Sequence, residues 1–432
     1  MKVWLKLLIA LILGVILGIF NPFNMDSVID SFHFIGQLFN NSLSFLVIPV
    51  IFISLIFSSY SLRESRNLAK TLLFSILLMV IITLFSLLIA FLAGNLFQPG
   101  AYIHYAISEG ERFYIPDFKD FILNIIPKNI FAVLLRPFYN IINIQSLDNV
   151  NTGYKALISE RYYLWSLIFV SILLGITMNS RKKSEILLKV SDSFYDLINH
   201  IADLFIEVFP FGGLFFTVYL FTSGVFSLTI IQNAIMIIIT IVISFLFLLI
   251  IYLLIIQFYV KINAFKFLFS LLGSIIIGFM TGNNIMNIVP TLKNVEKNLG
   301  VNAEIGSPVV IMSALLNRPG TLITAAVCVL AITQKLSMDV LNLNIQMLLY
   351  FTLFITFFKL DGFPELGFLV LIAFALQASP KLEPTAYAVY TSMVPLFSRL
   401  AAVFDTISAG FAAAVIGRMQ NKITIINSKD FF

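Results

Sequence analysis

The chain has 432 residues, of which 59% are hydrophobic and only 11% are charged. A water-soluble core of this length does not require such a composition, so the sequence indicates a polytopic membrane protein. The net charge of +5 implies no nucleic-acid partner, because basic residues in short cytoplasmic loops are the usual topology signal of membrane proteins.

Sequence signals for an enzyme or a cofactor are absent. The one cysteine, Cys328, excludes an internal disulfide, and the three histidines show no metal-ligand spacing. The chain contains no Walker loop, HExxH or GxSxG motif. We therefore expect a protein that is not an enzyme and that carries neither a cofactor nor a metal, apart from a transported or coupling ion.

The first hundred residues predict three membrane spans, at about 3–20, 34–58 and 70–97. Each is near the roughly 20 residues that cross a bilayer. The first lacks the small-residue cleavage site of a signal peptide, which indicates a retained span. Three basic residues lie between the second and third spans, so the positive-inside rule places that loop and the N-terminus in the cytoplasm.

Residues 98–161 are polar and punctuated by proline, which indicates an external loop rather than a second soluble domain. A fourth span is predicted to end near Met178, before a basic cluster that we place in the cytoplasm. A fifth span follows, and a sixth covers about 228–260. Asp203 and Glu207 lie at the polar start of the fifth span, where we expect them at the wet helix end rather than in a proton relay.

The pattern changes after residue 260. Residues 265–280 and 285–290 are apolar arms around a polar tip that contains Asn283 and Asn284. Neither arm can cross a bilayer alone, so the sequence predicts a re-entrant hairpin. The two asparagines would either offer amide groups to a substrate or cap the turn.

Residues 304–333 form an apolar run of membrane length, interrupted at its middle by Asn317-Arg318-Pro319-Gly320-Thr321. Proline lacks an amide donor and glycine destabilises a helix interior, so we expect about one unwound turn. In transporters such broken helices hold substrates and coupling ions. The alternative is a proline kink without a ligand, which Arg318 disfavours because its charge would cost about 3 kcal/mol or more at the bilayer centre.

The same design recurs in residues 343–376, a second hairpin candidate, where Gly362 and Gly367 would let the tip approach a ligand or serve only the turn. A final span, about 385–416, carries Arg399 and Asp405. Hairpin, broken helix, hairpin and charged helix make an inverted repeat with a binding site at the membrane midplane. We expect an all-α membrane protein with about eight transmembrane helices and two re-entrant hairpins.

Several local strings carry a resemblance to a known family: 98–104, 125–131, the ungapped spacing from Pro290 to Asn317-Arg318-Pro319-Gly320-Thr321, and Gly362-Phe363-Pro364-x-x-Gly367. They resemble the dicarboxylate/amino acid:cation symporter family, the glutamate transporter homologues, over nearly the whole chain. The resemblance implies a homotrimer in the cell membrane, with both termini cytoplasmic. It also implies an elevator-like movement of a transport core at 261–418 against a scaffold mostly within 1–260, with 419–432 as a cytoplasmic tail.

The resemblance implies that Arg399 is the arginine that holds a substrate carboxylate. The family's serine-rich tip of the first hairpin is replaced here by Asn283 and Asn284, and its Met-Asp in the broken helix by Arg318 and Pro319. In the last helix, the family's residues for the substrate ammonium and for sodium are replaced at Leu396, Val403 and Ile407.

We therefore expect a symporter-like secondary transporter for a small carboxylate, either glutamate or aspartate or a C4-dicarboxylate, with degraded sodium sites. An uncoupled uniporter or channel and a non-transporting membrane sensor remain alternatives. Arg399 would clamp the carboxylate with help from the Thr321 hydroxyl. A structural Arg399–Asp405 ion pair is the other possibility, which their six-residue separation on one helix disfavours.

The coupling ion, sodium or a proton, remains open in the sequence. Asn317, Gly320 and Asp405 surround the position where the guanidinium of Arg318 would stand in for a bound cation. On that hypothesis transport would be insensitive to sodium. A snorkelling Arg318 without a specific role is the alternative.

Overall fold

The computed structural model describes residues 2–20, 26–64, 68–102, 166–178, 185–222, 228–335, 346–347, 349–354, 393–424, 426–427 and 431. Regular structure in these residues is helical, apart from one isolated β-bridge between Val301 and Ile423. The longer helices are α1 (Val3–Phe20), α2 (Asp26–Glu64), α3 (Leu68–Phe97), α7 (Glu185–Thr222), α8 (Leu228–Ile255), α12 (Ala303–Leu316), α13 (Pro319–Lys335) and α17 (Val394–Met419). Shorter pieces are η1 (Pro99–Tyr102), the helix Ser166–Met178, the π-helical η4 (Ile256–Val260), α9 (Ala264–Ser270), α10 (Leu272–Thr281) and α11 (Ile288–Lys297).

Seven of the described helices are long and apolar enough to cross a membrane, or eight if the bent pair α9–α10 forms one span. The predicted all-α polytopic fold is therefore confirmed. The first predicted hairpin corresponds to α9, α10 and α11, with a bend of 52° between α9 and α10. Most of the predicted external loop and of the second hairpin, including Gly362 and Gly367, lies outside the described residues.

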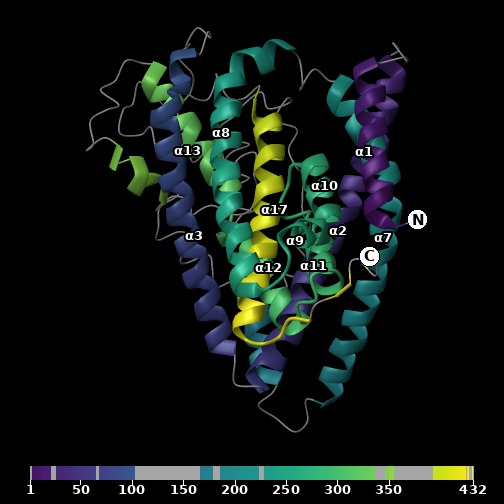
Figure 1. Ribbon diagram of the computed structural model, residues 1–432. Coiled ribbons are helices and arrows are strands. Elements are labelled where there is room, and N and C mark those ends of the chain that lie inside the picture. The colour runs from purple at the N-terminus through teal and green to yellow at the C-terminus, as the bar shows by residue number, and fades with distance from the viewer. Residues whose placement is uncertain are drawn as a thin grey trace.

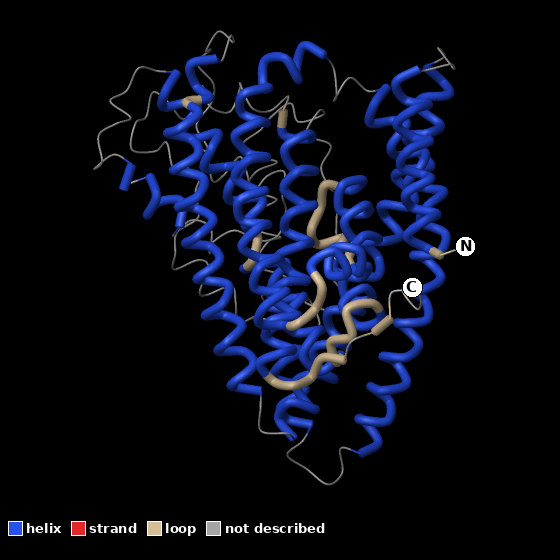
Figure 2. Tube along the Cα trace, viewed as in Figure 1, coloured by secondary structure: helices blue, strands red, loops and turns tan. Residues whose placement is uncertain are grey.

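The helices divide into two packed groups. Figure 1 shows α1 and α7 at one side of the molecule and α3 and α8 toward the other, with α17 between them. Helices α1 and α2 pack against α7, whereas α3 packs against α13 and α8, and α17 contacts α10, α12 and α13. Figure 2 shows the loops that interrupt the helices in the central region, where the candidate site lies.

Burial separates the lipid-facing helices from the central ones. Only 28% of α1 is buried, while 94% of the span made by α12 and α13 is buried within the protein. The exposed positions of α1, α3 and α8 are largely leucine, isoleucine and phenylalanine, as a lipid-facing surface requires. A polar break in α12–α13 is therefore surrounded by protein rather than by lipid, which is the condition for irregular backbone at membrane depth.

The two groups meet at a polar contact between α7 and the hairpin helix α11. Asp203 of α7 forms ion pairs with Lys293 at 3.2 Å and Lys297 at 2.9 Å. Tyr195 of α7 lies 3.3 Å from a carboxylate oxygen of Glu296, which also accepts from Ser307 of α12 at 3.1 Å. Burial raises the pKa of Glu296 and lowers that of Lys293. Asp203, 26% exposed, therefore joins the two helix groups.

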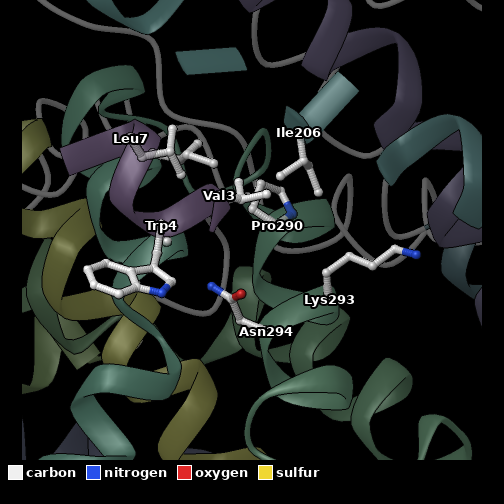
Figure 3. A pocket seen from close by; sticks show the side chains of 9 residues that line it. Val3, Trp4, Leu7, Ile206, Pro290, Lys293 and Asn294 are labelled. Atoms are coloured by element: carbon white, nitrogen blue, oxygen red, sulfur yellow. The ribbon is translucent and has the colours of Figure 1, made fainter. Parts of the chain in front are cut away.

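Figure 3 shows a small cavity beside this contact, where α1 and α7 face α10 and α11; among its lining residues are Val3, Trp4, Leu7, Ile206, Pro290, Lys293 and Asn294. Two of its polar side chains are engaged elsewhere, whereas the buried Trp4 Nε1 has no hydrogen-bond partner within the described residues. Lys293 donates to the Asn199 carbonyl at 3.1 Å, and Asn294 donates to Ser274 at 2.6 Å. The cavity thus belongs to the packing contact between the two groups.

The chain after α17 returns to the connection between α11 and α12. Thr424 N donates to Gly300 O at 2.8 Å, and Asn302 N donates to Lys422 O at 3.0 Å. Gly300 has φ +79°, and a Cβ there would lie 1.9 Å from Thr424 O, so this position requires glycine. The start of the predicted tail is thereby fixed to the hairpin region.

Candidate functional site

The broken helix opens at the residues that the sequence indicates. Helix α12 ends at Leu316 and α13 begins at Pro319. In a continuous helix the Leu315 carbonyl would accept from the amide of residue 319, but proline has none. The Nε of Arg318 donates to that carbonyl instead, at 3.2 Å. Arg318 is 1% exposed, so its guanidinium is enclosed at the break.

Asp405 of α17 occupies the N-terminus of α13. One carboxylate oxygen accepts from Gly320 N at 2.6 Å and Thr321 N at 3.3 Å. The other accepts from the Thr321 hydroxyl and the Asn284 amide, both at 2.6 Å. The positive end of the α13 dipole and these four donors stabilise a carboxylate that is only 3% exposed.

These contacts bring much of the predicted site together, with Asp405 at its centre. Asn284, Gly320, Thr321 and Asp405 come together from the hairpin tip, the helix break and α17. From the sequence, Asn284 and Thr321 were expected to face a substrate. In the structure the amide of Asn284 and the hydroxyl of Thr321 both donate to Asp405, which therefore links the three elements.

Asn317 fastens the other side of the break to α17. Its amide donates to Ser408 O at 3.1 Å, and the Ser408 hydroxyl donates to Asn317 Oδ1 at 3.1 Å. The hydroxyl of Tyr252, from α8, lies 2.9 Å from the Ser408 hydroxyl. Neither Ser408 nor Tyr252 was singled out from the sequence. The one signal that pointed to them was a polar group inside an otherwise apolar helix.

Arg399 lies in α17 beside the tip of the first hairpin, and its side chain is almost fully buried. A Cβ added to Gly282 at the tip would lie 3.2 Å from Arg399 Cγ. The guanidinium is 6.0 Å from the ring centre of Phe216 of α7, and one of its nitrogens donates to Pro395 O. Within the described residues no ion pair joins Arg399 to Asp405.

Asn283 has a local role at the tip. Its side-chain oxygen accepts from Ile285 N at 2.9 Å, so that it caps the turn after Gly282. Gly282 itself has φ +63°, a conformation that favours glycine. Of the two asparagines at the tip, Asn283 shapes the turn and Asn284 reaches across to α17.

A second small cavity lies between the hairpin tip, α12 and α17, and its polar lining comprises Asn284, Asn287, Thr291, Ser313, Asp405 and Thr406. Three buried oxygen atoms in this lining have no hydrogen-bond partner within the described part of the chain: Asn284 Oδ1, Asn287 Oδ1 and Ser313 Oγ. Neither Asn287 nor Ser313 was singled out from the sequence. Each is a single polar residue between apolar neighbours in the sequence.

Comparison with known proteins gives a family match over nearly the whole chain. The model of the sodium:dicarboxylate symporter family matches residues 3–419. That range contains every residue described above as part of the site.

Curated relatives are similar along their whole length. A proton/sodium-glutamate symport protein of Bacillus caldotenax is 22% identical over 442 residues, covering 99% of this chain and 96% of the relative. A C4-dicarboxylate transport protein of Rhodopseudomonas palustris is 22% identical over 429 residues, covering 97% and 88%. A proton/glutamate-aspartate symporter of Escherichia coli is 19% identical over 435 residues, covering 96% and 92%.

Proposed function

The chain belongs to the sodium:dicarboxylate symporter family, and on this premise we propose that it moves a small carboxylate across the membrane by alternating access. The substrate class follows the relatives, which are named for glutamate, aspartate or C4-dicarboxylates. The protein acts as a carrier, and its chemistry is reversible binding.

The observation that carries this proposal is the burial of Arg399 beside the hairpin tip. A guanidinium that is 3% exposed in a membrane helix is costly, and such charges usually mark a substrate or ion pathway. Its planar fork matches the two oxygens of a carboxylate. A substrate carboxylate would accept two parallel hydrogen bonds from this fork, so Arg399 is the proposed clamp.

The packing of the helices supports an elevator-like movement. Helix α3 packs against α13 and α17, and α8 packs against α13 and stacks aromatic rings on α17. We therefore place α3 and α8 with the moving part, together with α9 to α13 and α17. Helices α1 and α2 both pack on α7, and these three form the scaffold. This division moves α3 and α8 out of the scaffold expected from residues 1–260. We also propose that the protein is a homotrimer, on the basis of the family resemblance. Its termini are placed in the cytoplasm because the basic loops indicate that orientation.

At the helix break, Arg318 takes the place of a bound cation. Its Nε bonds the carbonyl that Pro319 leaves without a helical partner, and its charge interacts with that of Asp405. A sodium ion at the same position would be repelled by the guanidinium. The break itself is therefore independent of sodium in this proposal.

Two other functions remain for the same fold, and reconstitution separates them. A carrier accumulates its substrate when an ion gradient or a counter-substrate drives it. An uncoupled uniporter or channel would equilibrate the substrate whatever gradient is imposed. A membrane sensor would bind a ligand without flux. Uptake into proteoliposomes under separately imposed sodium and proton gradients distinguishes the three.

The substrate is expected to need a carboxylate but to depend little on an α-ammonium group. Leu396 and Val403 stand where the family's ammonium partners stand, and an ammonium beside leucine would lose its hydration without gaining a partner. Competition against a bound carboxylate measures this. Succinate, malate and fumarate should compete at least as well as aspartate and glutamate. A preference for the amino acids of about a hundredfold, or roughly 2.7 kcal/mol, would contradict the prediction.

A further inference from the structure

We propose that the chain after α17 is a regulatory strap, which packs on the first hairpin where the hairpin meets α1 and thereby restrains the elevator-like movement. The strap comprises residues 420–424, 426–427 and 431 among those that the structure describes. The inference rests on the proposed function for the movement that is restrained, but not for the contacts themselves. The sequence had indicated only a cytoplasmic tail at 419–432.

The first anchor of the strap is the connection between α11 and α12. Ile423 forms an antiparallel β-bridge with Val301, beside the backbone hydrogen bonds described above. The Lys422 ammonium lies 3.5 Å from the Glu304 carboxylate at the start of α12. Both sides of this anchor belong to the moving part, so the anchor survives the movement and directs the rest of the strap.

The second anchor is Phe431, which packs on Phe269 of α9. The centres of the two rings are 5.8 Å apart. Phe431 is only 3% exposed, although it lies beyond the last helix. Burying a phenylalanine side chain shifts an equilibrium by roughly ten- to a hundredfold, so this ring favours the docked strap strongly enough for one substitution to release it.

Phe269 also contacts the scaffold. Its ring meets the ring of Trp4 of α1 edge to face, with 4.8 Å between the centres. The buried Trp4 Nε1 has no hydrogen-bond partner in the described part of the chain, so ring packing rather than hydrogen bonding holds Trp4 here. Figure 1 shows the C-terminal end of the chain close to the start of α1. The strap therefore packs on a residue of the moving part that touches the scaffold.

The contact of α1 with α9 and α10, which we call the α1 seam, must break when the moving part shifts. A Cβ on Gly273 of α10 would lie 3.8 Å from Leu7 of α1, so the seam continues along the hairpin arm beyond Phe269. By fixing the Phe269 ring, Phe431 favours the position in which that ring meets Trp4. A contact present in one position only stabilises that position relative to the others. Release of the strap should therefore make the seam open more often.

The test measures how often the α1 seam opens in the purified full-length protein without substrate. Ile277 of α10 is 1% exposed and lines the cavity against α1. After Ile277→Cys, a maleimide should react at this position only when α10 leaves α1. Cys328→Ala is combined with it and removes the one native cysteine. The labelling rate then reports opening of the seam.

In this background Phe431→Ala should raise the labelling rate at least about threefold, and by at most the roughly hundredfold that one buried phenylalanine supplies. Phe431→Leu keeps an apolar side chain and should give a smaller rise. Deletion of residues 425–432 removes the second anchor entirely and should act like Phe431→Ala. Phe265→Ala is the matched control, because it makes the same substitution in α9 at a side chain that is 83% exposed, and it should leave the rate unchanged.

Uptake after reconstitution separates a restraint from mere packing. The maximal rate of carboxylate uptake should rise in Phe431→Ala while KM stays the same, since the substitution does not touch the carboxylate site. A labelling rate that neither Phe431→Ala nor the deletion raises would overturn the proposal. Faster labelling without faster uptake would show only a loosened contact and would overturn it too. If the wild type transports nothing, the proposed function fails, and the labelling rates still decide whether the strap holds the seam.

Discussion

Arg399→Ala is expected to abolish carboxylate binding while the protein remains folded and inserted in the membrane. Without the guanidinium, a substrate carboxylate would be buried with no charged partner. Breaking a buried ion pair in this way costs about 3 to 5 kcal/mol, which corresponds to an affinity loss of at least about a hundredfold. A micromolar substrate would then bind too weakly for saturation at accessible concentrations.

Equilibrium binding of a labelled carboxylate to the purified variant measures this loss. Arg399→Lys keeps the charge but not the fork, so it should bind with intermediate affinity. Arg418→Ala makes the same substitution near the end of α17, away from the site, and should bind as the wild type does. An affinity that survives in Arg399→Ala would remove this residue from the site.

Asp405→Ala is expected to be the most destabilising single change in the site and to stop transport. It would leave Gly320 N, Thr321 N, the Thr321 hydroxyl and the Asn284 amide without their acceptor. Buried donors without partners cost about 1–3 kcal/mol each, and only part of that cost can be relieved by water entering the space. The hairpin tip would also lose its hydrogen bond to α17.

Thermal unfolding in detergent and uptake after reconstitution report the two effects separately. Thr321→Val removes one donor of the four and keeps the carboxylate, so its unfolding temperature should fall less than that of Asp405→Ala. An Asp405→Ala protein that melts and transports like the wild type would show that this carboxylate does not hold the site together.

The fold and the break could be predicted because their causes are local. Membrane spans follow from runs of apolar residues, and Pro319 with Gly320 marks the helix interruption whatever surrounds it. The broken helix accordingly opens between Leu316 and Pro319. The second hairpin was inferred from a similar local pattern and stays a prediction.

The hydrogen-bond network of the site could not be predicted, because the residues that bond to one another are distant in sequence. Asp405 bonds residues 84, 85 and 121 positions away, and nothing near it in the chain identifies them. Asn284 and Thr321 were expected to face a substrate because their side chains can donate, but a carboxylate from α17 takes those donors. The oxygens of Asn287 and Ser313 acquire significance only from the atoms that surround them.

The central claim, that this protein carries a small carboxylate held by Arg399, is tested most directly by uptake into proteoliposomes. Purified wild-type and Arg399→Ala proteins are reconstituted in parallel and offered labelled succinate, malate, fumarate, aspartate and glutamate under imposed sodium or proton gradients. The account predicts gradient-driven accumulation of at least one of these substrates by the wild type and none by the variant. Folded wild-type protein that accumulates none of them under either gradient, or accumulation that the variant retains in full, would contradict it.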